Sequence, residues 1–172
     1  MASGSHAACC WERALAACDS DRFLAAGVDA VCFGEGEQTI VELAQLASRG
    51  RPAWQDVEGI AWRRNGQTVH NPPRPPIADL DDLPFPDRTG SPIRMYRDFC
   101  SPSMRLPFVT LMASRGCPMQ CSYCTAWRHW KEQVRFRTPG NVLAEIDELV
   151  QKYGVRYITM IDSVFGSEWE WL

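Results

Sequence analysis

Residues 106–124 read Leu-Pro-Phe-Val-Thr-Leu-Met-Ala-Ser-Arg-Gly-Cys-Pro-Met-Gln-Cys-Ser-Tyr-Cys. The apolar first half has the length and composition of a β-strand, and it ends where Arg115 and Gly116 begin a loop. Three cysteines follow in the spacing C-x3-C-x2-C, namely Cys117, Cys121 and Cys124. Cysteine thiolates are soft donors that suit iron–sulfur clusters and zinc, and three of them on one short loop can face a common centre. The stretch therefore predicts a metal site at the carboxyl end of a strand.

The number of thiols bears on which metal is bound. A four-iron cubane cluster held by three thiolates keeps one iron open to a small molecule, whereas a ferredoxin closes that position. Zinc is the alternative, because His129 completes a C-x3-C-x2-C-x4-H pattern that supplies Cys3His ligands. Structural zinc sites usually pair two C-x2-C or C-x4-C knuckles, so the spacing favours the cluster.

The strand followed by Ser-Arg-Gly-Cys-Pro-x-x-Cys-x-Tyr-Cys resembles the cluster loop of the radical S-adenosylmethionine (radical SAM) enzymes. The resemblance implies a [4Fe-4S] cluster on the three cysteines, with its open iron chelated by the amino and carboxylate groups of SAM. It implies that the reduced cluster cleaves SAM to a 5'-deoxyadenosyl radical. Tyr123 is expected beside SAM, Arg115 beside the anionic cluster, and Trp127 and Trp130 as cover that excludes water.

Composition sets the broad class. The chain has 172 residues, of which 45% are hydrophobic and 23% charged, which suits one domain or parts of two. A formal net charge of −3 gives no electrostatic case for nucleic acid, and no apolar run reaches membrane-spanning length. The chain opens without a secretory signal, and the remaining cysteines follow no disulfide spacing, so we predict that the protein is located in the reducing cytoplasm. These are Cys9, Cys10, Cys18, Cys32 and Cys100.

The first part of the chain predicts a strand, a glycine turn and a helix. A helix is expected from Trp11 to Cys18 and a short buried strand over residues 29–33. The turn Gly34-Glu35-Gly36 leads into a helix with apolar positions at helical spacing, for which Thr39 or Glu37 is the expected cap.

Asp29-x-Val-x-x-Gly-Glu-Gly-Glu-x-Thr also resembles the last strand and helix of the cobalamin-binding domain that precedes many radical SAM modules. The resemblance implies that Gly34, Glu35 and Gly36 line a cobalamin pocket. The upstream strands of such a domain and an Asp-x-His-x-x-Gly cobalt-ligand turn are not in this sequence. We therefore expect the tail of a Rossmann-like domain.

The middle of the chain predicts a hairpin and a connector. Two alternating runs flank Asn65-Gly66 within residues 59–70, which is a strong two-residue turn signal. The proline-rich residues 71–76 cannot continue a ladder, and residues 79–87 form an acidic, proline-bounded linker. Asp81 and Asp82 are interpreted as a solvated run rather than as metal ligands.

The last part predicts a strand–helix–strand unit. Thr138 is a good N-cap, Pro139 suits the first helical position, and Val142, Ile146, Leu149 and Val150 form one apolar stripe. A second strand over residues 157–161 ends at Asp162 and Ser163. In the resembling family this strand end supplies polar groups to the SAM amino group, which the resemblance assigns to these two residues.

These observations predict an α/β chain that is an internal fragment of a longer enzyme. Its expected parts are a Rossmann-like remnant (1–58), a hairpin and proline-rich linker (59–104) and the start of a radical SAM partial TIM barrel (105–172). The resemblance implies cobalamin-dependent methyl transfer or ring formation on a small-molecule substrate, with a flavodoxin- or ferredoxin-type electron donor. The alternatives are a radical SAM methylthiotransferase, which needs a second cluster, and a zinc-binding interaction module.

Overall fold

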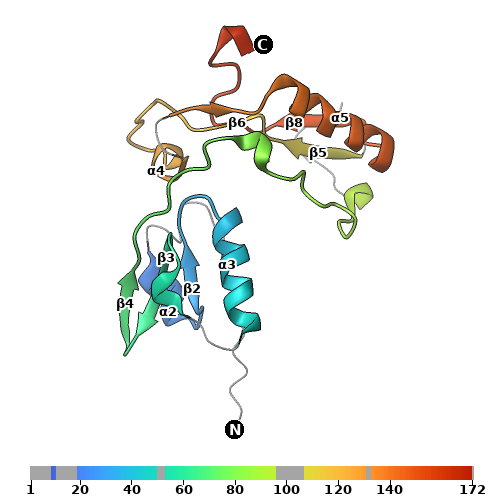
Figure 1. Ribbon diagram of the computed structural model, residues 1–172. Helices are drawn as coiled ribbons and strands as arrows, with labels where there is room; N and C mark the ends of the chain where they lie inside the picture. Colours follow the sequence, from blue (N-terminus) through green and yellow to red (C-terminus); the bar gives the residue numbers. More distant parts are fainter. Residues whose placement is uncertain (1–8, 11–18, 50–52, 96–106, 131–132, 172) are drawn as a thin grey trace. The chain divides into compact units, whose positions relative to one another are not determined.

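The computed structural model describes residues 9–10, 19–49, 53–95, 107–130 and 133–171 (Figure 1). The chain forms two compact units, which are described separately below. The first unit comprises Met1–Ile77 and Cys121–Lys131, and the second comprises Ala78–Gln120 and Glu132–Leu172. The predicted helix over residues 11–18 and the side chain of Cys100 lie outside the described residues. None of the helices in the described ranges is long and apolar enough to span a bilayer.

The first unit is built on a mixed sheet with the strand order β1-β2-β3-β4. Its strands are β1 (Cys9–Cys10), β2 (Ala30–Cys32), β3 (Ile60–Arg64) and β4 (Gln67–His70). β1 runs parallel to β2, and α2 (Ser20–Ala25) connects them, while β2, β3 and β4 pair antiparallel. The helix α3 (Glu37–Ser48) follows β2, and the short helices η1 (Trp54–Asp56) and α4 (Ala126–Trp130) complete the unit.

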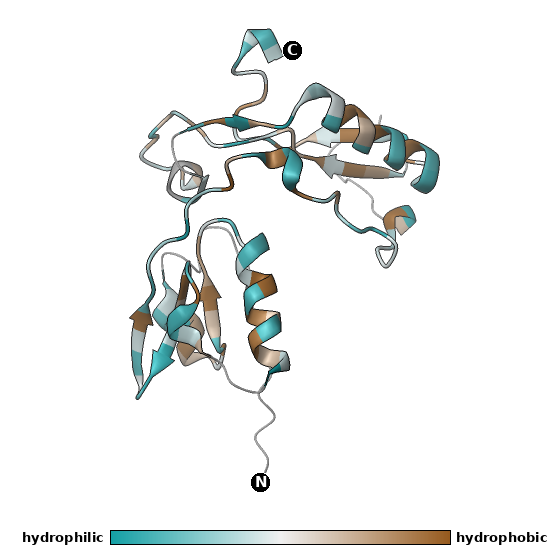
Figure 2. Ribbon diagram, viewed as in Figure 1, coloured by the Kyte–Doolittle hydropathy of each residue, from teal (hydrophilic) through white to brown (hydrophobic). Residues whose placement is uncertain are grey.

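Both faces of this sheet are covered. Ala30 packs with Leu43 of α3, whereas its neighbour Val31 packs with Leu24 of α2, because successive side chains of a strand point to opposite faces. Figure 2 shows the hydrophobic residues of β2 and the alternation of hydrophobic and hydrophilic positions along α3. A strand buried on both faces explains why residues 30–32 are apolar without interruption.

The predicted hairpin is confirmed. Arg64 pairs with Gln67, which leaves Asn65 and Gly66 as the two turn residues. Both have a positive φ, 51° and 81° respectively, as a type I′ turn requires. The hairpin does not stand apart as a connector, because β3 pairs with β2 and extends its sheet. The first unit accordingly continues to Ile77, beyond the predicted boundary at residue 58.

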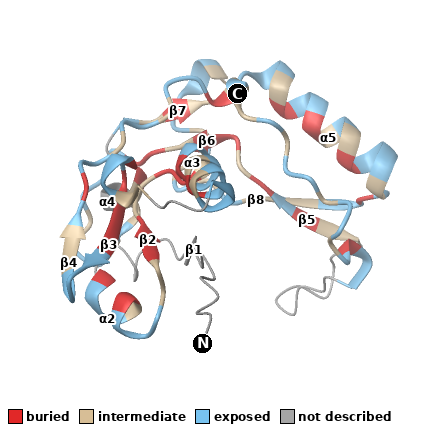
Figure 3. Cartoon of the chain, turned by 60° about the horizontal axis from the view of Figure 1, so that its bottom comes forward, coloured by how far each residue is buried: buried red, intermediate tan, exposed pale blue. Residues whose placement is uncertain are grey.

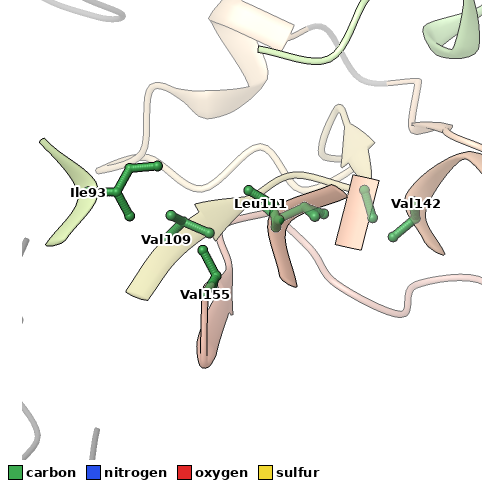
Figure 4. Packing of buried hydrophobic residues seen from close by; sticks show 7 residues of the cluster. Ile93, Val109, Leu111, Val142 and Val155 are labelled. Atoms are coloured by element: carbon green, nitrogen blue, oxygen red, sulfur yellow. The ribbon is translucent and has the colours of Figure 1, made fainter. Parts of the chain in front are cut away.

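The second unit is built on two parallel strands covered by one helix. The strands are β5 (Phe108–Leu111) and β8 (Tyr157–Met160), and the helix between them is α5 (Pro139–Tyr153). The strand–helix–strand prediction is therefore confirmed. Figure 4 shows the core, in which Val109 and Leu111 meet Val142, Val155 and Ile93. The short elements are β6 (Ser114–Arg115), β7 (Arg135–Phe136), η2 (Leu80–Asp82), η3 (Ile93–Met95) and η4 (Trp169–Trp171).

The ends of α5 agree with the sequence, but its buried stripe differs. Thr138 is the N-cap, and its side-chain oxygen accepts the N–H of Asn141 at 3.2 Å. Gly154 closes the helix in the left-handed conformation. Val150, predicted in the apolar stripe, is half exposed, while the charged Glu145 is 2% exposed. Figure 3 shows that buried and exposed positions alternate along α5. The helical period puts residues 142, 145, 146 and 149 on one side and turns Val150 away.

One further prediction is wrong. The cap of α3 is Gly36, which has no side chain to bond, while Thr39 is fully buried and its hydroxyl accepts the N–H of Arg74 Nε at 3.0 Å. The acidic segment of residues 79–87 lies within the second unit, where its Leu80 is buried and its Asp82 is exposed. Its Asp87 accepts the N–H and hydroxyl of Thr89, which hold the pKa of that carboxyl below its usual value.

Candidate functional site

The carboxyl ends of β5 and β8 lie at one edge of the second unit. The strands are parallel, with Leu111 opposite Met160, and the N–H of Ile161 donates to the Leu111 carbonyl at 2.9 Å. Each strand therefore delivers its following residues to the same edge, where ligand sites of parallel α/β sheets form. The cysteine loop begins beyond β5 and Asp162 follows β8.

Asp162 fixes the turn that leaves β5. Its Oδ1 accepts the backbone N–H of Ala113 at 3.0 Å, the backbone N–H of Ser114, and the Ser114 hydroxyl at 2.6 Å. Ser114 is 2% exposed, so these donors would have no water to bond if the carboxylate were removed. The other oxygen, Oδ2, is buried and has no hydrogen-bond partner among the described residues. Ser163, the next residue, is exposed.

A narrow neck closes the cysteine loop, which we define as residues 116–134. β6 and β7 pair antiparallel with Arg115 opposite Arg135, and the N–H of Arg137 donates to the Ala113 carbonyl at 2.8 Å. Gly116 stands at this neck with φ +115°, and a Cβ built on it would lie 2.2 Å from the Gln133 carbonyl oxygen. A side chain at residue 116 would therefore force the two ends of the loop apart. This pairing could not be predicted from the sequence, because each strand has only two residues.

The predicted metal ligands are free thiols. Cys117 is buried, Cys121 and Cys124 are half buried, and none of them forms a disulfide. Cys121 and Cys124 share a turn in which the N–H of Cys124 donates to the Cys121 carbonyl at 3.1 Å. The Cys124 sulfur accepts the N–H of Ala126 at 3.5 Å. Backbone N–H bonds to sulfur are among the contacts that tune the potentials of iron–sulfur clusters.

The division of the chain into two units passes between Cys117 and Cys121, so each thiol is described within its own unit. Across the described ranges, no three His, Cys, Asp or Glu side chains form a ready metal-binding group. The assignment of the three thiols as ligands stays a prediction.

The aromatic residues of the loop differ in exposure. Tyr123 is 89% exposed, whereas Trp130 is 6% exposed. The rings of Trp130 and His129 pack edge to face, with their centroids 4.4 Å apart. The side chain of Trp127 lies outside the described residues. Trp130 is thus packed within the first unit, and its role as cover for a cluster stays a prediction.

The glycine turn of the first unit, predicted to line a cobalamin pocket, is held by Glu35. Gly34 has φ +81°, and a Cβ there would meet nothing within 4 Å. Glu35 is 6% exposed, and its carboxylate accepts the N–H of Ile77 at 2.6 Å. Gly36 begins α3. This carboxylate therefore ties the turn to the end of the first unit, a role that the sequence did not reveal.

The second unit is an α/β unit in which the parallel strands β5 and β8 are joined through the cysteine loop and α5. Residues 111–165 match the family model of the radical SAM superfamily. This segment, from the end of β5 to the residues that follow β8, is similar to the radical SAM enzymes.

Two curated relatives align with most of this chain, but the alignment includes only a small part of each relative's own length. One is named an uncharacterised methyltransferase of Pyrococcus horikoshii; it is 33% identical, across 80% of this chain and 29% of its own length. The other is named an anaerobic magnesium-protoporphyrin IX monomethyl ester cyclase of Rubrivivax gelatinosus; it is 33% identical, across 78% of this chain and 24% of its own length. This chain thus spans less than a third of either relative.

Among solved structures, the fold resembles that of OxsB, described as a cobalamin-dependent S-adenosylmethionine radical enzyme with aqua-cobalamin and S-adenosylmethionine bound. The TM-score is 0.66 at 22% identity, across 89% of this chain and 20% of that one. This likeness supports the α/β class predicted from the sequence.

Proposed function

We propose that the whole protein is a cobalamin-dependent radical SAM enzyme that transfers a methyl group to a carbon of a small-molecule substrate. The observation that carries the proposal is the cysteine loop at the end of β5, inside the segment that matches the radical SAM family. The relative named a methyltransferase supports the reaction class. The residues described here supply the metal loop and the strand-end carboxylate of that enzyme.

The donor set fits the cluster that the family implies. Cys117, Cys121 and Cys124 are free thiols, and thiolates are the usual ligands of [4Fe-4S] clusters. When bound, the reduced cluster supplies the electron that cleaves SAM. The residues of the loop would hold the cluster and limit its contact with water. The burial of Cys117 would keep water away, and the N–H donated to Cys124 Sγ would fix the position of that sulfur.

SAM would meet residues that follow the two parallel strands. Asp162 uses Oδ1 to hold the turn after β5, and its Oδ2 remains as an acceptor for the ammonium group of SAM. Ser163 adds a second polar group at the same strand end. Tyr123 is exposed, which leaves its ring accessible to the ligand.

We assign the first unit to the tail of a Rossmann-like cobalamin-binding domain. Its parallel β1 and β2 and the helices on both faces of the sheet are features of doubly wound folds. Gly34, Glu35 and Gly36 would line the corrin pocket. We assign β5, α5 and β8 to the first strand–helix–strand of a partial TIM barrel, whose ligands bind at the carboxyl ends of the strands.

Two further elements complete the proposal. The enzyme needs a reductant, and we predict a flavodoxin- or ferredoxin-type electron donor. We also predict that the enzyme is located in the cytoplasm. Ring formation is the second candidate reaction, because one 33% identical relative is named a cyclase.

The test uses the full-length protein, reduced anaerobically with SAM and methylcobalamin. We expect 5'-deoxyadenosine to form, and its yield to fall to background in Cys121→Ala. Cys100→Ala serves as the matched thiol control and should keep the yield. A protein that holds a full cluster yet cleaves no SAM would contradict the proposal, and product analysis would separate methyl transfer from ring formation.

A further inference from the structure

A buried carboxylate joins three separate segments of the second unit. Glu145 of α5 is 2% exposed and is paired with two arginines. Arg88, from the segment before β5, approaches its Oε1 at 2.8 Å, and Arg137, directly after β7, approaches its Oε2 at 2.6 Å. Both arginine side chains are themselves largely buried. A buried charge is tolerated only when it is paired and hydrogen-bonded, so the three residues depend on one another.

Arg137 also donates hydrogen bonds to residues that precede and follow the cysteine loop. Its Nη1 also donates to the Met112 carbonyl at 3.0 Å, and its Nε donates to Asn141 Oδ1 at 2.7 Å. Its backbone N–H donates to Ala113, and its carbonyl accepts the indole N–H of Trp171 at 2.7 Å. Arg137 therefore bonds the start of the loop from a position just past its end.

The segment before β5 also contacts Arg137 and the residue that follows it. The ring of Phe85 lies 5.5 Å from the Arg137 guanidinium carbon, which is a cation–π contact. Asp81 accepts the N–H and the hydroxyl of Thr138, the N-cap of α5, at 3.0 and 2.6 Å. Residues 79–87 thus contact both Arg137 and the residue that follows it.

We propose that Arg137 is a positioning residue for the cysteine loop: held by Glu145, it fixes the Met112 carbonyl where the chain leaves β5, and so sets the loop's neck. The proposal deepens the proposed function, on which its consequence for the cluster rests. A guanidinium suits this task because it presents several donors in a fixed plane, whereas an ammonium offers one nitrogen.

Arg137→Lys is the discriminating variant. A lysine keeps a cation for Glu145 but cannot bond Met112, Asn141 and Glu145 together. Arg88→Met is the matched variant, because it removes the other ion pair of the same carboxylate and leaves the bond to Met112. Glu148→Gln is the surface control, since Glu148 pairs with Lys152 one turn further along α5 and takes no part in the Arg137–Glu145 contacts.

The experiment measures hydrogen exchange in the full-length apoprotein and electron paramagnetic resonance after reconstitution. In Arg137→Lys, amides of β6 and β7 should exchange about tenfold faster, as expected for the loss of one charge-assisted hydrogen bond, while those of β8 stay unchanged. The SAM-induced change in the reduced cluster's spectrum should weaken in the same variant. Arg88→Met and Glu148→Gln should leave β6 and β7 as in the parent.

Either of two results would overturn the proposal. One is that hydrogen exchange in β6 and β7 is unchanged in Arg137→Lys. The other is that β8 of this variant, or β6 and β7 of Arg88→Met, lose as much protection as β6 and β7 of Arg137→Lys, which would mean that Arg137 contributes only to the overall stability of the unit. Exchange in the apoprotein does not depend on the metal. A parent protein that takes up no cluster, with a loosened neck in Arg137→Lys, would therefore contradict the proposed function and support this inference.

Discussion

Gly34 follows strand β2 and Gly116 follows strand β6, and both have a positive φ, 81° and 115° respectively. They differ in what surrounds them. A Cβ on Gly34 would meet nothing within 4 Å, whereas a Cβ on Gly116 would lie 2.2 Å from the Gln133 carbonyl oxygen. One turn needs glycine for its backbone angle alone, and the other needs it because a second stretch of backbone passes beside it. Similar glycine signals in a sequence thus mark different structural demands.

The largest expected effect comes from Gly116→Ala. The new methyl group collides with backbone that cannot rotate away, so the β6–β7 pairing must open. We expect a loss of about 3 kcal/mol or more in the free energy of unfolding. Chemical denaturation measures this, together with cluster uptake, which should be abolished. A variant within about 1 kcal/mol of the parent would show that the neck is not closed as described.

A smaller effect is expected from Asp162→Ala, which removes the group that fixes the turn before Gly116. Three donors on Ala113 and Ser114 lose their acceptor, and Ser114 is buried. We expect a loss of about 2–3 kcal/mol by denaturation, because each unsatisfied buried donor is costly. Asp162→Asn keeps an acceptor oxygen and should retain most of that stability. Its affinity for SAM should nevertheless fall, and equal SAM binding by Asp162→Asn would argue against a role for the carboxylate charge.

Gly34→Ala should have the smallest effect of the three. The space around Gly34 is open, so only the left-handed backbone angle opposes a side chain, at a cost of about 1–2 kcal/mol. Thermal unfolding of the two alanine variants side by side measures the difference. An equal loss at Gly34 and Gly116 would remove the contrast between the two turns.

The sequence predicted the elements whose signals are local. The hairpin at Asn65-Gly66, the capping of α5 by Thr138 and the separate elements β5, α5 and β8 all depend on residues close together in the chain. Apolar periodicity and turn chemistry act over such short spans, so they can be recognised without knowing the fold.

The sequence did not predict the contacts that hold the candidate site. Arg88 bonds Glu145 across 57 residues, and Asp162 bonds Ser114 across 48. Glu145 was missed because a charged residue on a helix is expected to be solvated unless its partners are known. The contact between Asp81 and Thr138 was missed for the same reason, since the two residues lie 57 positions apart in the chain.

The central claim is that Cys117, Cys121 and Cys124 hold an iron–sulfur cluster whose open iron binds SAM. Its most direct test is iron, sulfide and zinc analysis of the anaerobically reconstituted protein, combined with electron paramagnetic resonance of the reduced cluster with and without SAM. We predict about four irons per chain, a signal that SAM perturbs, and loss of the cluster in Cys117→Ala, Cys121→Ala or Cys124→Ala. Cys100→Ala and His129→Ala should keep it. Bound zinc that is lost in His129→Ala, or a cluster that is lost in Cys100→Ala while the fold stays intact, would contradict the account.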